Sequence, residues 1–255
     1  MEARRHNLRQ VWALLRPRTE PALRLCLFLL AWAWSALALC APHDHKTSVV
    51  LAPGYAPLAF LPPAPGTYAL PTMGDAADGD VIDSRGNAAR LFEFLGDKPT
   101  LLSFIFTTCD DVNGCPLATY VMRGVHDALQ ADPKTANKVR LISFSFDPLF
   151  DTPDVIAAYG AQFRDPDADW QFLTTDGPSS LDPILRAYDQ WVIRDYDQNG
   201  DYMGTMSHIL RVFLIDKERR IRNIYSTSFL HADTVVNDVR SLLIESNGPA
   251  AVVGR

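Results

Sequence analysis

Three short apolar runs in the middle of the chain are each followed by an amphipathic stretch. The runs have the length of buried strands and the stretches have the length and spacing of helices. In chain order the six segments are 101–106, 116–131, 139–146, 153–163, 170–174 and 179–188. Because strands that alternate with helices usually pair in parallel, the pattern predicts an α/β sandwich around a central sheet.

Further segments complete this unit at both ends. The apolar runs 209–216 and 221–225 are separated by four polar residues, which predicts an antiparallel hairpin. Turn residues around Val81 and Ile82 predict a second hairpin near the start, and 231–246 is the last predicted helix. We therefore predict one domain over residues 67–246, followed by a frayed tail over 247–255.

A different pattern occupies the first 66 residues. Residues 25–41 carry no charge and follow an arginine-rich segment, residues 1–24, which we expect to stay in the cytoplasm. Residues 25–41 are predicted to be a transmembrane anchor or signal segment, and the Pro-rich residues 42–66 an extended tether. An uncleaved anchor is favoured, while peptidase cleavage and lipidation of Cys40 stay open. The domain would then lie in the bacterial periplasm or another extracytoplasmic space.

The charge balance narrows the choice of partners. The chain has 255 residues, 47% of them hydrophobic, and a net charge of -6, which excludes disorder of the whole chain. Residues 1–24 carry a net charge of +4, so the remainder carries -10. Because nucleic acids select basic surfaces, no nucleic-acid partner is expected for this acidic part.

The cysteines are divided between the two parts of the chain. Cys26 and Cys40 belong to the hydrophobic segment, so the exported part holds only Cys109 and Cys115. In an oxidising compartment such a pair is by default a structural disulfide. However, this pair follows a predicted central strand, and the loops at the carboxyl ends of such strands are where α/β proteins place their functional groups. A functional pair is therefore favoured over a structural one.

The spacing of the two cysteines predicts a loop. Six helical positions correspond to about 600°, so two sulfurs on one helix would face different sides. Asn113-Gly114 supplies a turn, and Pro116 suits the first position of the following helix. Cys115 would then be the N-cap, where the helix dipole lowers the pKa of a thiol, although Asp110 and Asp111 oppose this effect.

A histidine completes the candidate site. His208 directly precedes the run 209–216 and is thus expected at an end of the sheet. Two thiolates and one imidazole suit copper, whereas zinc usually requires a fourth ligand. Met203 and Met206 flank the histidine and could add a thioether, but packing is the favoured role for both.

Two acidic segments have simpler interpretations. Asp147 and Asp151-Thr152-Pro153 are predicted to form a turn and the start of a helix. Residues 195–201 resemble the first half of a calcium-binding loop, but Met206 stands where the bidentate glutamate should be. We therefore predict a solvent-exposed hairpin close to His208.

Four ordered blocks over roughly residues 69–244 resemble the Sco/SenC copper chaperones of cytochrome c oxidase assembly. They are LLSFIFTTCDDVNGCPLA, SFDPLFDTPDVIAAYGAQF, WQFLTT and SHILRVFLID. The resemblance implies a thioredoxin-like fold, a central mixed sheet flanked by helices, and a copper ion, Cu(I) or Cu(II), bound by Cys109, Cys115 and His208. The family usually has three residues between the cysteines, whereas this chain has five, two of them acidic.

Four functions remain as candidates. The leading one is a membrane-tethered metallochaperone, not an enzyme, that delivers copper to the copper-bearing subunit of cytochrome c oxidase or to another exported copper protein. The alternative is a thiol-disulfide oxidoreductase in which Cys109 and Cys115 reduce the copper-ligand cysteines of the same acceptor. A peroxidase is disfavoured because its cysteine motif is missing, and a domain that binds no metal and holds a disulfide is the fourth candidate.

Overall fold

The computed structural model of the chain describes residues 49–165 and 168–248. Over these residues no helix is both long enough and apolar enough to cross a membrane. The predicted basic segment, the predicted anchor at 25–41, the first part of the tether and nearly all of the tail lie outside the described residues.

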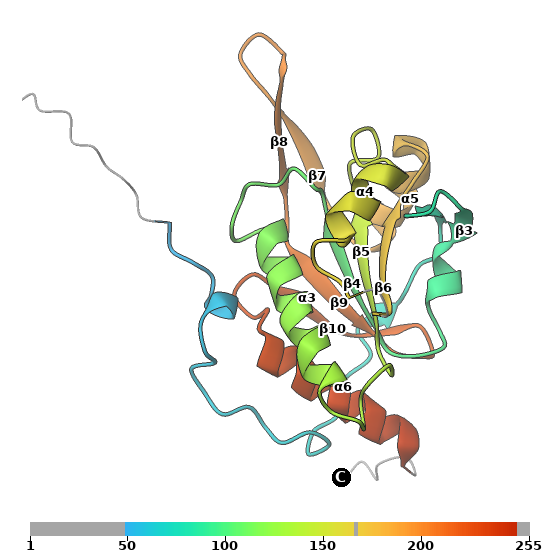
Figure 1. Cartoon of the computed structure of the whole chain (residues 1–255). Coiled ribbons are helices and arrows are strands. Elements are labelled where there is room, and N and C mark those ends of the chain that lie inside the picture. Colours follow the sequence, from blue (N-terminus) through green and yellow to red (C-terminus); the bar gives the residue numbers. More distant parts are fainter. Residues whose placement is uncertain (1–48, 166–167, 249–255) are drawn as a thin grey trace, which may run out of the picture. The chain divides into compact units, whose positions relative to one another are not determined.

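The main sheet of the described chain is mixed and has eight strands (Figure 1). Strands β4, β5 and β6 pair in parallel, and every other neighbouring pair is antiparallel. In sheet order the strands are β1 (Gly74–Asp75), β10 (Arg220–Ser226), β9 (Arg211–Ile215), β4 (Thr100–Ile105), β5 (Arg140–Ser145), β6 (Trp170–Thr174), β2 (Asp80–Asp83) and β3 (Ala88–Arg90). The predicted strand runs, their parallel pairing and both predicted hairpins are confirmed.

Helices cover both faces of this sheet, so the predicted α/β sandwich is confirmed. Because side chains alternate along a strand, β4 sends Leu101 to one core and Leu102 to the other. The first core is closed by helices α3 (Cys115–Gln130), α4 (Pro153–Gly160) and α6 (Ala232–Asn247). The second is closed by α5 (Pro178–Ala187) and the short 3₁₀ helix η3 (Leu91–Phe94).

A second, two-stranded sheet projects from the body of the domain (Figure 1). It consists of β7 (Val192–Tyr196) and β8 (Tyr202–His208), which pair in antiparallel fashion. This is the predicted solvent-exposed hairpin. Arg194 on β7 forms an ion pair of 2.7 Å with the buried Asp147 in the loop after β5, which ties the base of the hairpin to the main sheet.

The compact unit begins at Val50, ahead of the predicted domain boundary at residue 67. The 3₁₀ helix η2 (Pro53–Tyr55) lies so close to the domain that a Cβ atom on Gly54 would be 2.3 Å from the carbonyl oxygen of Leu230. Proline content predicts an extended backbone. It does not reveal whether the extended segment docks, which here depends on contacts with distant residues.

Candidate metal centre

As predicted, the cysteines belong to the segment between β4 and α3: Cys109 lies in the connecting loop, residues 106–114, which we call the cysteine loop, and Cys115 directly follows it. The central strand β4 ends at Ile105, and the chain enters α3 at Cys115. Gly114, not Cys115, is the N-cap, because its carbonyl oxygen accepts the first helical hydrogen bond, from Ala118 at 3.2 Å. The predicted cap is therefore wrong by one residue. The buried sulfur of Cys115 belongs to the first helical residue, where backbone N–H groups have no helical partner.

His208 reaches the loop from the end of β8. Its Nδ1 donates to the carbonyl oxygen of Met206 at 3.1 Å, so the other ring nitrogen, Nε2, is the one free to accept a proton or bind a metal. The imidazole lies against the rings of Phe106 and Phe146, with centroids 5.6 and 5.1 Å away. These aromatic rings restrict its orientation before any ligand binds.

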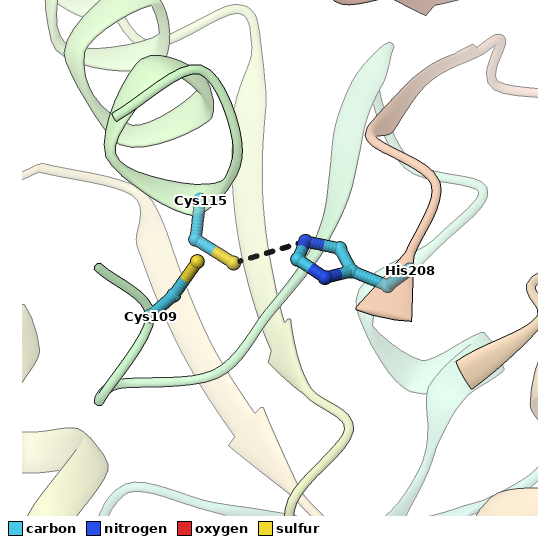
Figure 2. A group of neighbouring side chains, drawn as sticks. All are labelled: Cys109, Cys115 and His208. Atoms are coloured by element: carbon cyan, nitrogen blue, oxygen red, sulfur yellow. Dashed lines mark hydrogen bonds between the residues drawn. The ribbon is translucent and has the colours of Figure 1, made fainter. Parts of the chain in front are cut away.

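The fold brings the three predicted ligands together (Figure 2). The two sulfurs and a ring nitrogen of His208 all lie within 4.8 Å of one another, and Cys115 Sγ is 3.6 Å from His208 Nε2. Both cysteines are free thiols, Cys109 half-buried and Cys115 buried. The cluster therefore presents two soft sulfur donors and one borderline nitrogen donor toward a common point.

The two thiols have opposite acidities. The hydrogen bond from Cys115 lowers the pKa of Cys109 to about 6 against the opposing effect of burial, and the backbone N–H groups of Cys115 and Asp111 contribute in the same direction. The same sulfur–sulfur hydrogen bond, together with burial, raises the pKa of Cys115. The sequence argument set the helix dipole at Cys115 against the charges of Asp110 and Asp111, and the structure assigns the lower pKa to Cys109.

This difference predicts selective alkylation of Cys109 in the metal-free protein. In a chain with Cys26→Ser and Cys40→Ser, iodoacetamide should modify Cys109 with a rate that rises through a midpoint near pH 6 and is flat above about pH 7.5, because only the thiolate reacts. Peptide mapping by mass spectrometry would follow both sites. A midpoint near the ordinary cysteine pKa of about 8.5 would contradict the assignment.

Asp151 is a supporting residue that the sequence analysis missed. The helix begins at Pro153 as predicted, but the Asp151 carboxylate does not cap it. The carboxylate is fully buried and accepts hydrogen bonds from Ser145 Oγ at 2.5 Å and from the backbone N–H and the hydroxyl of Thr107. Thr107 is two residues before Cys109, so Asp151 holds the first half of the cysteine loop. A local helix-start motif carries no signal for such a distant bond.

The site opens into a cavity of about 290 Å³ on the side of the hairpin. Cys109, Asp110, Asp111 and His208 line it, together with residues of β8. Met206 is buried in the core and Met203 is exposed, so packing is confirmed only for Met206. The opening leaves room for a ligand supplied by another molecule.

A second cluster, His126, Asp127 and Asp165, also places possible ligand atoms close together. However, Arg123 forms ion pairs with Asp127 at 2.9 Å and Asp165 at 3.4 Å. Because this guanidinium already pairs with both carboxylates, a cation would have to displace it, and the cluster is better explained as an ion-pair network.

Comparison with known proteins agrees with this architecture. The chain is 25% identical over 150 residues to the SCO1 protein homolog of Bacillus subtilis, over 58% of this chain and 73% of that protein. The structure of Bradyrhizobium japonicum ScoI with copper bound shares 27% identity and a TM-score of 0.55, over 66% of this chain and 99% of that one. The apo Sco1 protein of Thermus thermophilus shares 27% identity and a TM-score of 0.56, over 69% and 95%.

These likenesses confirm the predicted thioredoxin-like fold. The SCO1/SenC family profile matches residues 77–244, which include the cysteine loop, the hairpin and the histidine. Since this match covers more than half of the chain, the chain belongs to the SCO1/SenC family.

Proposed function

We propose that the chain is a copper metallochaperone that binds one copper ion through Cys109, Cys115 and His208. The observation that carries this proposal is the convergence of two sulfurs and one imidazole nitrogen within 4.8 Å at the mouth of an open cavity. Family membership and the copper-bound Bradyrhizobium relative support it. The donor set suits copper in both oxidation states, because thiolates favour Cu(I) and imidazole also accepts Cu(II).

The protonation states in the site are compatible with metal uptake. Cys109 is already a thiolate at neutral pH, since its pKa is about 6. His208 Nε2 carries a free lone pair when Nδ1 donates to Met206. Cys115 has to lose its proton when the metal binds, so loading should release about one proton per copper.

Copper would leave by ligand exchange. The cavity borders Cys109 and His208, so a donor from an acceptor protein can approach these two ligands from outside, whereas Cys115 is buried. The acceptor we propose is the copper-bearing subunit of cytochrome c oxidase or another exported copper protein. We further propose that residues 25–41 hold the chain in the membrane, with the domain in the periplasm or an equivalent extracytoplasmic space.

The reactivity of the cysteine pair favours a second candidate, a thiol-disulfide oxidoreductase. The Cys109 thiolate would attack a disulfide of the acceptor and form a mixed disulfide, releasing the first acceptor sulfur as a thiolate. Cys115, whose proton can pass to His208 Nε2 at 3.6 Å, would then attack Cys109 and release the second acceptor sulfur, which takes up that proton from His208. The acceptor gains two electrons and the Cys109–Cys115 pair is oxidised to a disulfide.

A transfer experiment separates the two functions. The full chain with Cys26→Ser and Cys40→Ser, in detergent, is loaded with copper and mixed with the copper-binding domain of the oxidase subunit in its dithiol form. We expect one copper per chain before mixing, and copper on the acceptor after separation by size and metal analysis.

The disulfide form of the acceptor, mixed with the metal-free reduced chain, serves as the second arm. Reduction of that disulfide, combined with no stable copper on this chain, would contradict the chaperone function and support the oxidoreductase. A Cys115→Ser chain is the control for both arms, because it should lose copper binding and can resolve no mixed disulfide.

A further inference from the structure

The second half of the cysteine loop is held by the segment that precedes the sheet, residues 50–56. The side-chain amide of Asn113 forms two hydrogen bonds to the backbone of this segment. Its Oδ1 accepts from the N–H of Ala52 at 2.7 Å, and its Nδ2 donates to the carbonyl oxygen of Val50 at 2.8 Å. One side chain thus satisfies a donor and an acceptor of a strand-like segment, as a neighbouring strand would.

Three neighbouring contacts make this attachment rigid. The hydroxyl of Tyr55 donates to the carbonyl oxygen of Val112 at 2.6 Å, so the segment bonds to two consecutive residues of the loop. The ring of Tyr55 packs against Tyr120 on α3, with centroids 4.9 Å apart. Gly54 lies against Leu230, with no space for a side chain. The segment is therefore docked on the domain and on the loop at the same time.

The cysteine loop is consequently fastened at both ends by different parts of the chain. The buried carboxylate of Asp151 holds Thr107 before Cys109, and residues 50–56 hold Val112 and Asn113 before Cys115. Inside the loop, Cys109 N–H donates to the carbonyl oxygen of Phe106 at 3.3 Å and Gly114 N–H to that of Asp111 at 2.8 Å. The relative position of the two sulfurs therefore depends on both fastenings.

We infer that Asn113 is a positioning residue of the metal centre and that residues 50–56 form part of the centre through it. Asn113 contacts no ligand atom itself. It fixes the backbone two residues before Cys115 and, through the turn closed by Asp111, the residues that follow Cys109. The inference deepens the proposed copper function and rests on it for its metal readout.

The test compares two asparagines that bond to the part of the chain before the sheet, one within residues 50–56 and one at Pro63. Asn113→Ala removes the bonds to Val50 and Ala52, whereas Asn237→Ala removes a bond from α6 to the carbonyl oxygen of Pro63. Both are made in the full chain with Cys26→Ser and Cys40→Ser. Copper affinity, the thiolate-to-Cu(II) charge-transfer band and thermal unfolding of the metal-free protein are measured for each.

Asn113→Ala should weaken copper binding by about 10-fold to 100-fold and shift the charge-transfer band, as expected when the support of a ligand is removed. Tyr55→Phe should change copper affinity and the charge-transfer band in the same direction by a smaller amount. Asn237→Ala should lower the unfolding temperature but leave affinity and band unchanged. If Asn113→Ala matches the parent chain in affinity and band, or if Asn237→Ala shifts the band equally, the inference is overturned.

A thiol readout separates this inference from the copper proposal. In glutathione buffers, the pair and one glutathione disulfide exchange to the Cys109–Cys115 disulfide and two glutathione thiols, so the equilibrium reports how well the sulfurs are positioned. If the parent chain binds no copper, the proposed function fails, and the inference is then judged by this equilibrium alone. A shift of about 3-fold or more in Asn113→Ala only would support it, and equal values in all variants would refute it.

Discussion

Replacement of His208 by alanine should abolish tight copper binding while leaving the cysteine pair able to form a disulfide. The change removes the one nitrogen donor of the cluster, whose Nε2 lies 3.6 Å from Cys115 Sγ. Loss of residues that merely support a ligand lowers metal affinity by about 10-fold to 100-fold, so loss of the ligand itself should lower copper affinity by more than about 100-fold. The sulfurs are positioned by the β4–α3 loop and the start of α3, whose backbone bonds the substitution leaves in place.

Anaerobic titration followed by metal analysis and absorption spectroscopy would measure this effect. His126→Ala is the matched control, because His126 is a buried histidine of α3 that contacts Asp127 and the ring of Trp170. It should cost about 0.5–3 kcal/mol of stability without changing the copper spectrum. An unchanged copper affinity and spectrum in His208→Ala would show that the ligand assignment is wrong.

Replacement of Asp151 by alanine should destabilise the domain by about 3 kcal/mol. The carboxylate is fully buried and accepts hydrogen bonds from Thr107 and Ser145, so its removal leaves buried donors without partners. At about 2–4 °C per kcal/mol for a domain of this size, the unfolding temperature should fall by about 6–12 °C. Calorimetry or circular dichroism of the metal-free chain would measure it.

The neighbouring Asp154 provides the control. It is exposed in the first turn of the same helix, so Asp154→Ala should cost only about 0.5 kcal/mol through the helix dipole. Asp151→Asn retains one oxygen acceptor, so its loss of stability should lie between those of Asp151→Ala and Asp154→Ala. If Asp151→Ala unfolds within about 2 °C of the parent chain, the buried carboxylate does not hold the loop as described.

The sequence was sufficient to predict the elements of the fold. Runs of apolar residues located β4, β5 and β6, and polar interruptions located the β9–β10 hairpin. These features are local, because the hydrophobic period of a strand or helix repeats within a few consecutive residues. For the same reason the cysteine segment was correctly predicted as a loop, since two sulfurs six positions apart cannot share a helix face.

Local reasoning was less successful where distant contacts decide the outcome. It weighed only the helix dipole at Cys115 against the charges of Asp110 and Asp111, whereas the bond between the sulfurs lowers the pKa of Cys109 and, together with burial, raises that of Cys115. It interpreted Asp151 as part of a helix start, although its carboxylate bonds to Thr107, 44 positions away. It also treated residues 50–56 as tether, although they bond to Asn113 and Val112 in the cysteine loop.

The sequence by itself thus determined the strands, the helices, the loop and the donor types of the candidate site. Only the tertiary structure decided that Cys115 and His208, 93 positions apart, lie 3.6 Å from each other, and that Asp151 and residues 50–56 fasten the two halves of the cysteine loop. The physical reason is that periodicity encodes which face of an element is buried, whereas the distance between two side chains depends on how all the elements pack.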